Sequence, residues 1–206
     1  MAPVSNEAGD FASGLVSTMV PAMTASRRSY ALALAIFVAA AAILWAMGRN
    51  PLCTCGRIDL WGPVGPTQSQ MLADWYSFSH IVHGFLFYAL LKWAAPSWPT
   101  GWRFAAAMAI EAAWEVLENT PMIIDRYREA TAALGYEGDS ILNSLADVAM
   151  MAVGFLLARK LPVWASIAIV LALELIPLFI IRDNLTLNVW MLLLPTDWLK
   201  EWQSAA

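Results

Sequence analysis

Charged side chains are scarce in this sequence, and their scarcity excludes an ordinary soluble protein. Lys, Arg, Asp and Glu together make up 14% of the chain, whereas an average soluble domain carries about 25%. Hydrophobic residues make up 60% of the 206 residues. A soluble domain of this length could not bury so much apolar surface. The composition therefore predicts an integral membrane protein surrounded by membrane lipids.

Positive charge is not in excess either, and histidine and cysteine are rare. The net charge is −4, and nucleic-acid-binding proteins carry clustered positive charge, so we expect no nucleic-acid partner. The two cysteines, Cys53 and Cys55, are separated by one residue in a loop. They are either a redox or metal-binding pair, or two loop thiols or one local disulfide.

Long apolar runs divide the chain into predicted spans. Crossing the hydrocarbon core of a membrane takes about 20 apolar residues, and five runs approach that length. These runs are residues 30–47, 74–95, 103–119, 140–158 and 162–181. Many of the eleven tryptophans lie near their ends, which is typical of side chains at the level of the lipid headgroups.

The segments at the two ends of the chain do not read as spans. Residues 1–29 are rich in Ala, Ser, Thr and Pro, and we expect a flexible tail there. Residues 185–194 are apolar but too short to cross, so we expect an interfacial or re-entrant helix. Residues 30–206 are thus predicted to form an all-α integral membrane domain, a bundle of about five transmembrane helices plus this short C-terminal helix.

Basic residues in the short loops predict the orientation of the bundle. Arg27, Arg28, Lys92, Arg103, Arg159 and Lys160 would all lie on one side of the membrane. The loops on that side are short and free of acidic residues, whereas those on the other side contain several. Because short basic loops stay in the cytoplasm, we expect a cytoplasmic N-terminus.

Acidic residues inside the third run form a single stripe. Glu111, Glu115 and Glu118 are four and three positions apart, which places them on one face of a helix. An ionisable residue at the centre of a membrane helix costs about 2.5–3.5 kcal/mol. The stripe is therefore expected to face the interior of the bundle.

Two other runs repeat this single-faced pattern. His80 and His83 are three apart in the second run, and Asp139, Asn143 and Asp147 are four apart in the fourth. Because successive spans alternate in direction, these polar residues are predicted to gather at one face of the membrane, the outer one. Further polar residues expected at that end are Asp74, Asn119, Arg126, Arg182, Asp183 and Asn184.

Four blocks of the sequence resemble a family of small multi-pass inner-membrane proteins of bacteria, mainly alphaproteobacteria. The blocks are residues 74–88, 111–128, 135–155 and 182–189. The resemblance implies a location in the bacterial inner membrane. With the orientation predicted above, the polar end then faces the periplasm. The order of features more distantly resembles VanZ-like membrane proteins, with Asp and His opening one span, a Glu-rich next span, then Gly-Asp, a further Asp and a Gly. Neither resemblance implies an activity.

The polar residues make a set of candidate metal ligands. Imidazole and carboxylate groups suit a divalent metal such as zinc, and ligands three or four apart on helices can converge inside a bundle. The candidate ligands are His80, His83, Glu111, Glu115, Asp139 and Asp147. A water activated by such a metal could hydrolyse a lipid or lipid-linked envelope substrate, with Glu115, Glu118 and Asp147 as the candidate catalytic residues.

Other interpretations of the same residues stay open. The polar side chains could form a buried network with Arg126, Arg128 and Arg182 that holds the helices together without chemistry. The protein would then be a non-catalytic binding module or an assembly partner of a membrane complex, and the sequence does not decide whether it is an enzyme. Gly84, Gly138 and Gly154 are expected at helix contacts or turns.

The polar motif after the fifth run also has two interpretations. Asp183 and Asn184, with Asn188, could fold over the polar site as a lid. Alternatively, Asp183 and Asn184 could cap the short helix that follows.

Overall fold

The computed structural model describes residues 7–65, 67–131 and 135–205, with side chains from residue 27 onward. Within these ranges the chain forms eight α-helices and no strands. The helices are α1 (Glu7–Ala46), α2 (Ser77–Ala94), α3 (Thr100–Glu118), α4 (Pro121–Ala130), α5 (Ile141–Lys160), α6 (Val163–Ile181), α7 (Leu185–Leu193) and α8 (Asp197–Ser204), and a short 3₁₀ turn lies at Gln68–Gln70. The predicted all-helical architecture is confirmed.

In the part of the chain that the structure describes, three helical segments are long and apolar enough to cross a membrane, fewer than the five predicted. They are Arg27–Ala46, Ile141–Lys160 and Val163–Ile181. The helices α2 and α3 have 18 and 19 residues and coincide with the second and third predicted runs. The histidine stripe lowers the mean hydropathy of α2, and the glutamate stripe lowers the mean hydropathy of α3.

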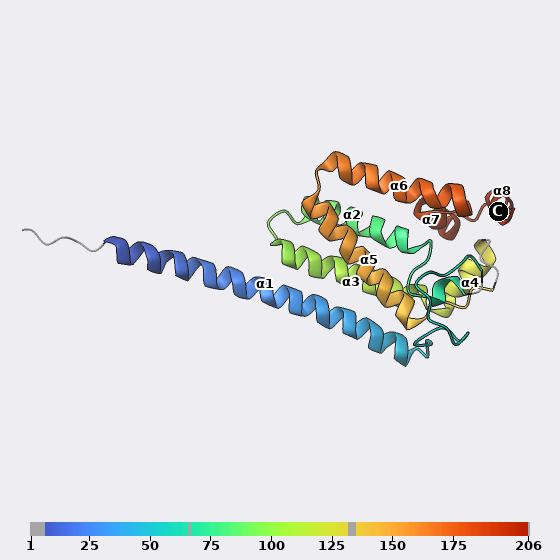
Figure 1. Ribbon diagram of the computed structural model, residues 1–206, viewed down its shortest axis with the longest axis horizontal. Helices are drawn as coiled ribbons and strands as arrows, with labels where there is room; N and C mark the ends of the chain where they lie inside the picture. The colour runs from blue at the N-terminus through green and yellow to red at the C-terminus, as the bar shows by residue number, and fades with distance from the viewer. Residues whose placement is uncertain (1–6, 66, 132–134, 206) are drawn as a thin grey trace, which may run out of the picture.

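The long helices lie side by side and the short ones gather at one end of the bundle (Figure 1). The helix α5 packs against α2 and α3, α1 packs against α3, and α6 packs against α2. Met108, Val148, Met151 and Phe155 are buried together between α3 and α5. Apolar packing therefore fills the middle of the bundle and leaves the polar residues at the end near α4, α7 and α8.

The closest approach in the bundle joins α2 to α5 through two glycines. A Cβ atom on Gly84 would lie 2.1 Å from the carbonyl oxygen of Met151. A Cβ atom on Gly154 would lie 2.0 Å from the carbonyl oxygen of Ile81. Only glycine lets the two backbones come this close. The expected helix contact at these residues is confirmed, and Gly138, with φ of +83°, occupies the expected turn.

Two helices were not predicted from the sequence. Residues 121–130 read as a polar connection, yet they form α4, which begins with Pro121 at a position where the missing N–H costs nothing. The second is α8, which follows the short helix α7 in the predicted region 185–194. Whether α7 lies at a membrane interface stays a prediction.

The N-terminal helix is longer than expected. It begins at Glu7, whereas the sequence predicted a tail over residues 1–29. Residues 1–6 lie outside the described residues, and the flexibility of the segment stays a prediction. Cys53 and Cys55 form a disulfide, the local one of the alternatives considered.

Candidate metal centre

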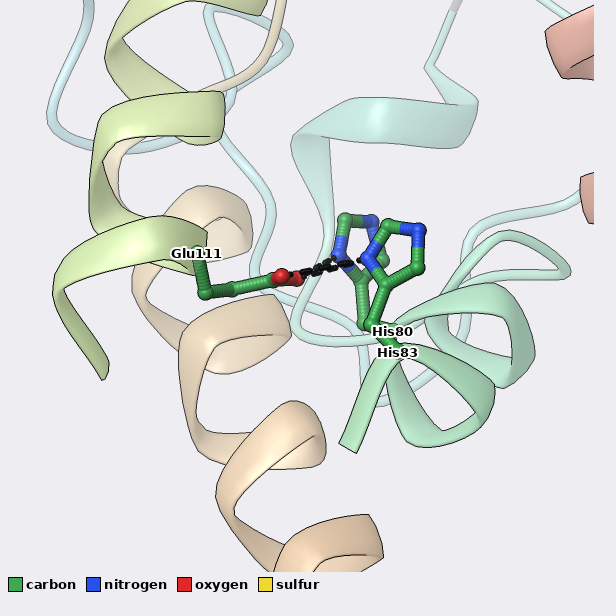
Figure 2. A group of neighbouring side chains, drawn as sticks. All are labelled: His80, His83 and Glu111. Carbon is green, nitrogen blue, oxygen red and sulfur yellow. Dashed lines mark hydrogen bonds and ion pairs between the residues drawn. The ribbon is translucent and has the colours of Figure 1, made fainter. Parts of the chain in front are cut away.

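Two histidines of α2 point at one carboxylate of α3 (Figure 2). The Nδ1 atom of His80 lies 2.5 Å from Glu111 Oε1. The Nδ1 atom of His83 lies 3.1 Å from each oxygen of Glu111. Glu111 is fully buried and His80 nearly so. Because the two histidines are three residues apart on one helix, both rings reach the same point on the neighbouring helix.

A second carboxylate reaches His80 one turn further along α3. Glu115 Oε1 lies 3.4 Å from His80 Nδ1, and the side chain is 1% exposed. Neither oxygen of Glu115 has a hydrogen-bond partner within the described part of the chain. Such an unpaired buried carboxylate is costly unless a proton or a cation compensates it.

Among the described residues, two groups of side chains have ligand atoms close enough to hold a metal ion, and both contain His80. In each group the ligand atoms lie within 4.8 Å of one another. One group is His80, His83 and Glu111, and the other is His80, Glu115 and Glu118.

Asp147 of α5 lies on the other side of the His80 ring. Its Oδ2 atom is 3.8 Å from His80 Nε2, and its Oδ1 atom accepts a hydrogen bond of 2.8 Å from the Ser77 hydroxyl. Asp147 belongs to neither of the two groups described above. The imidazole of His80 is therefore flanked by carboxylates from both α3 and α5.

Asp139, another predicted ligand, accepts hydrogen bonds from two neighbouring side chains, and its role as a ligand stays a prediction. Its carboxylate accepts bonds from Asn119 Nδ2 at 3.1 Å and from the Tyr136 hydroxyl at 2.9 Å. Burial raises the pKa of Asp139, and the bonds from Tyr136 and Asn119 oppose that shift. Asn119 also donates to Ser144 and accepts from the Asp139 backbone, so it joins the end of α3 to the start of α5.

Asp74 and Asn143 lie near the start of their helices, where backbone groups need partners. Asp74 Oδ1 accepts hydrogen bonds from the backbone N–H groups of Tyr76 and Ser77. Its Oδ2 atom is buried without a hydrogen-bond partner among the described residues. Burial and the nearby charge of Asp147 raise the pKa of Asp74 well above its usual value. Asn143 Nδ2 donates to the Met71 carbonyl and fixes the preceding loop on α5.

The three arginines of the alternative network contact backbone carbonyls instead of the buried carboxylates. Arg126 donates to the Leu192 carbonyl at 2.9 Å. Arg128 donates to the Tyr136 carbonyl, and Arg182 donates to the Trp202 carbonyl. Arg126 and Arg182 thus tie the short helices together, while the carboxylates beside His80 receive no arginine partner in the described ion pairs.

A cavity of about 840 Å³ adjoins the cluster. Its described lining includes seven acidic residues and both histidines, and it includes no Lys or Arg. The acidic residues are Asp74, Glu111, Glu118, Glu137, Asp139, Asp147 and Asp183. Apart from the two histidines and the tyrosines, the ionisable side chains in this described lining are therefore all acidic.

The segment after α6 closes one side of the cavity and also caps α7. Asp183 accepts hydrogen bonds from the Tyr76 hydroxyl at 2.7 Å and from Gln203 Nε2 at 3.0 Å. Burial raises the pKa of Asp183 to about 6. Asn184 Oδ1 accepts from the Leu187 N–H and caps α7. Asn188 accepts a hydrogen bond from the Tyr127 hydroxyl. The segment therefore caps α7 and covers the cavity at the same time.

Glu174 is the acidic residue of α6, and its carboxylate also accepts hydrogen bonds from the first turn of α7. The carboxylate accepts hydrogen bonds from the Leu185 N–H at 3.2 Å and from the N–H and hydroxyl of Thr186. A negative charge at a helix N-terminus is favourable. Glu174 therefore has a structural role apart from the histidine cluster.

Sequence reasoning missed the tyrosines of the cavity. Tyr76, Tyr127 and Tyr136 all line it, and each donates a hydrogen bond to a polar side chain. They come from a loop, from α4 and from the connection before α5, none of which carries a periodic polar stripe. The one local signal in the sequence for a tyrosine at the site was Tyr136, which lies three residues before Asp139.

These features define a class of protein, an all-helical one with apolar helices long enough to span a membrane and a buried histidine–carboxylate cluster beside an acidic cavity. The chain belongs to the family described as "Protein of unknown function (DUF2585)", which matches residues 44–205. No solved structure matches the chain.

Relatives of the chain come from several alphaproteobacteria. A UPF0314 protein of Sphingopyxis alaskensis is 51% identical over 181 residues, which cover 87% of this chain and 96% of the relative. UPF0314 protein Atu8092 of Agrobacterium fabrum is 50% identical, with 92% and 97% covered. A UPF0314 protein of Paracoccus denitrificans is 48% identical, with 90% and 98% covered. The predicted family of alphaproteobacterial proteins is confirmed, while the likeness to VanZ-like proteins stays a prediction.

Proposed function

We propose that this chain is a multi-pass protein of the bacterial inner membrane that binds a divalent metal ion at His80. The metal would activate a water molecule against a lipid or lipid-linked envelope substrate at the periplasmic face. The observation that carries the proposal is the buried carboxylate of Glu115, which has no hydrogen-bond partner among the described residues and lies 3.4 Å from His80.

Charge supports a cation at this place. Glu111, Glu115 and Asp147 surround one imidazole, and the described ion pairs give them no partner other than histidine. Buried charges of one sign are stable only when protons or a metal ion neutralise them. The group of His80, Glu115 and Glu118 offers one nitrogen and two carboxylates, a ligand set that suits zinc.

The neighbours of His80 suit the chemistry of a metal ligand. A histidine that binds a metal with one nitrogen usually donates its other N–H to a carboxylate. Glu111 lies at Nδ1 of His80, and Asp147 lies near Nε2. Whichever nitrogen binds the metal, a carboxylate is therefore available to orient the ring through the other nitrogen. Three protein ligands leave a coordination position for water, whose pKa a bound zinc lowers to about 7.

The surface of the helices supports the membrane assignment and the five spans. Along α6 the apolar side chains are largely exposed, with Phe179 at 80% and Val163 at 76%. The polar stripes of α2 and α3 meet each other through His80 and Glu111, so they would not contact lipid. The disulfide between Cys53 and Cys55, in the loop that leads to the cavity, suits an oxidising periplasm.

Metal analysis of the purified protein tests the proposal. We expect about one equivalent of a divalent metal in the wild-type protein, since one cluster offers the ligands. Glu115→Gln should lose the metal while the protein stays folded. The matched control is Glu201→Gln on the exposed face of α8, which should keep it. Absence of stoichiometric metal from the wild-type protein, even after incubation with zinc, manganese or iron, would overturn the proposal.

Hydrolysis is tested separately from metal binding. We expect the metal-loaded protein to release a product from a labelled lipid extract of the bacterial envelope, and Glu115→Gln not to do so. A protein that holds its metal but releases nothing would instead be a non-catalytic binding or assembly partner.

A further inference from the structure

The lining of the cavity beside the metal centre combines two kinds of side chain. Acidic side chains and tyrosines come from the loops, α3, α4 and α5. Apolar side chains come from α2, α3, α6 and α7. They include Phe87, Ile110, Trp114, Ile180, Ile181 and Val189. The lining of the cavity is thus amphipathic.

The lining of the cavity includes exposed apolar side chains on α3 and on α6. Each of these helices packs against α2, while no comparable packing joins α3 to α6 in the described residues (Figure 1). Ile110 on α3 is 43% exposed and Ile180 on α6 is 57% exposed, although both line the cavity. In a membrane, these two side chains would border an opening to the lipid.

The acidic side chains that line the cavity determine which sign of ligand charge is favoured there. Its described lining has seven acidic residues and no Lys or Arg, so an anionic headgroup would be repelled and a cationic one attracted. Asp74 Oδ2 is buried and has no hydrogen-bond partner, which leaves an acceptor for an N–H donor. The rings of Tyr76, Tyr127 and Tyr136 add faces on which a cation is favourable.

We propose that this cavity binds an amphiphile with a primary ammonium headgroup and an acyl or alkyl chain, which reaches it from the lipid between α3 and α6. The inference rests on the function proposed above and names the substrate class of that site. A primary ammonium has three N–H donors and one positive charge, which match Asp74 and the acidic lining. The volume of 840 Å³ lies within the range of about 300–1,000 Å³ that is usual for ligand pockets.

Quenching of tryptophan fluorescence tests the headgroup preference. The probes are 9,10-dibromostearylamine, 9,10-dibromostearyl alcohol and 9,10-dibromostearic acid, which share one chain and differ in charge. They are added to the full-length protein in phosphatidylcholine nanodiscs, both metal-free and metal-loaded. We expect the amine to quench at a concentration at least about tenfold lower than the other two, a difference of about 1.4 kcal/mol. Equal quenching by the alcohol or the acid in the metal-free protein would overturn the inference.

Variants locate the quenched site. Trp114→Phe should remove most of the quenching that the amine causes, because Trp114 lines the apolar wall. Ile110→Trp should block the opening and weaken amine binding, whereas Leu86→Trp, on an exposed position of α2 outside the cavity lining, should not. Asp74→Asn should reduce the preference for amine over alcohol. If Ile110→Trp and Trp114→Phe both leave the amine response unchanged, the proposed cavity is not the binding site.

Metal content separates this inference from the proposed function. A protein that holds its metal and shows no amine preference would overturn the ammonium ligand and leave the metal centre standing. A metal-free protein that resists loading but prefers the amine would support the ammonium cavity and overturn the metal centre.

Discussion

His80 Nδ1 lies 2.5 Å from Glu111 Oε1, and this contact joins α2 to α3 where the two side chains are 8% and 0% exposed. The pair lies outside the apolar core formed by Met108, Val148 and Met151, toward the end of the bundle that contains the cavity. It therefore fixes the relative rotation of the two helices, so that their polar faces meet each other.

Glu111→Ala should destabilise the protein strongly. The substitution leaves His80 and His83 without the carboxylate that both contact. Removing one partner of a buried pair costs about 3–5 kcal/mol, so the thermal midpoint in detergent should fall well below that of the wild type. Glu201→Ala, at an exposed position, is the control and should leave the midpoint unchanged. Similar midpoints for the two variants would show that the contact does not hold the helices together.

Gly154→Ala should separate α2 from α5. The added methyl would lie 2.0 Å from the Ile81 carbonyl oxygen, a backbone atom that cannot move without shifting the helix. Overpacking of this kind costs about 1–3 kcal/mol. Ala89→Ser, on an exposed position of α2, is a control of similar size. Measured metal content should fall along with the midpoint, because the displaced helix carries His80. An unchanged midpoint would contradict the close packing of the two helices.

Asn119→Ala should loosen the end of α3 from the start of α5. Its side chain donates to Asp139 and Ser144 and accepts from the Asp139 N–H. Leaving such buried groups unsatisfied costs about 1–3 kcal/mol. Hydrogen exchange should quicken at Asp139 and in the first turn of α5, while the α6 amides keep their protection. Uniform exchange changes across all helices would argue against a local role.

Asp183 should make stability depend on pH. Its folded pKa of about 6 exceeds the ordinary value of 3.8, so folding favours the protonated carboxyl. That contribution is fully present below about pH 4, falls as pH rises towards 6 and is absent above it. In the Asp183→Asn variant this part of the pH dependence should disappear. Thermal midpoints of both proteins between pH 4 and 7 measure it, and parallel curves would contradict the raised pKa.

Cys53→Ser tests the orientation of the membrane domain. The substitution leaves Cys55, which is exposed, as the one thiol in the chain. A membrane-impermeant maleimide should label it in cells whose outer membrane has been opened but whose inner membrane is intact. Labelling that requires permeabilising the inner membrane would place this loop and the cavity in the cytoplasm.

Much of the fold could be predicted because its signals are local. The apolar runs at residues 140–158 and 162–181 coincide with α5 and α6 to within two residues at each end. The i, i+3 and i+4 spacing of the acids in α3 predicted burial for Glu111 and Glu115, and both are buried. Helical periodicity can be read from the sequence of one helix. Burial of its polar face can therefore be predicted without knowing which helix packs against it.

The parts that could not be predicted depend on contacts between distant segments. Asp139 has the spacing of a ligand, but the hydrogen bonds that it accepts from Asn119 and Tyr136 could not be foreseen from that spacing. Arg126 had the charge to neutralise the acids, yet it donates to a carbonyl of α7. The directions of these side chains are set by how α4 and the loops dock, and no repeat in the sequence encodes that docking.

The bond between Glu174 and the first turn of α7 has a consequence for biogenesis. During synthesis the Glu174 carboxylate of α6 lacks the donors of α7 until Leu185, which lies 11 residues later, has been added to the chain. The helix that supplies these donors follows α6 directly. A chain that stopped after Ile181 would leave the carboxylate without the backbone N–H groups of Leu185 and Thr186 and without the Thr186 hydroxyl, so α6 is completed only when the first turn of α7 has been made.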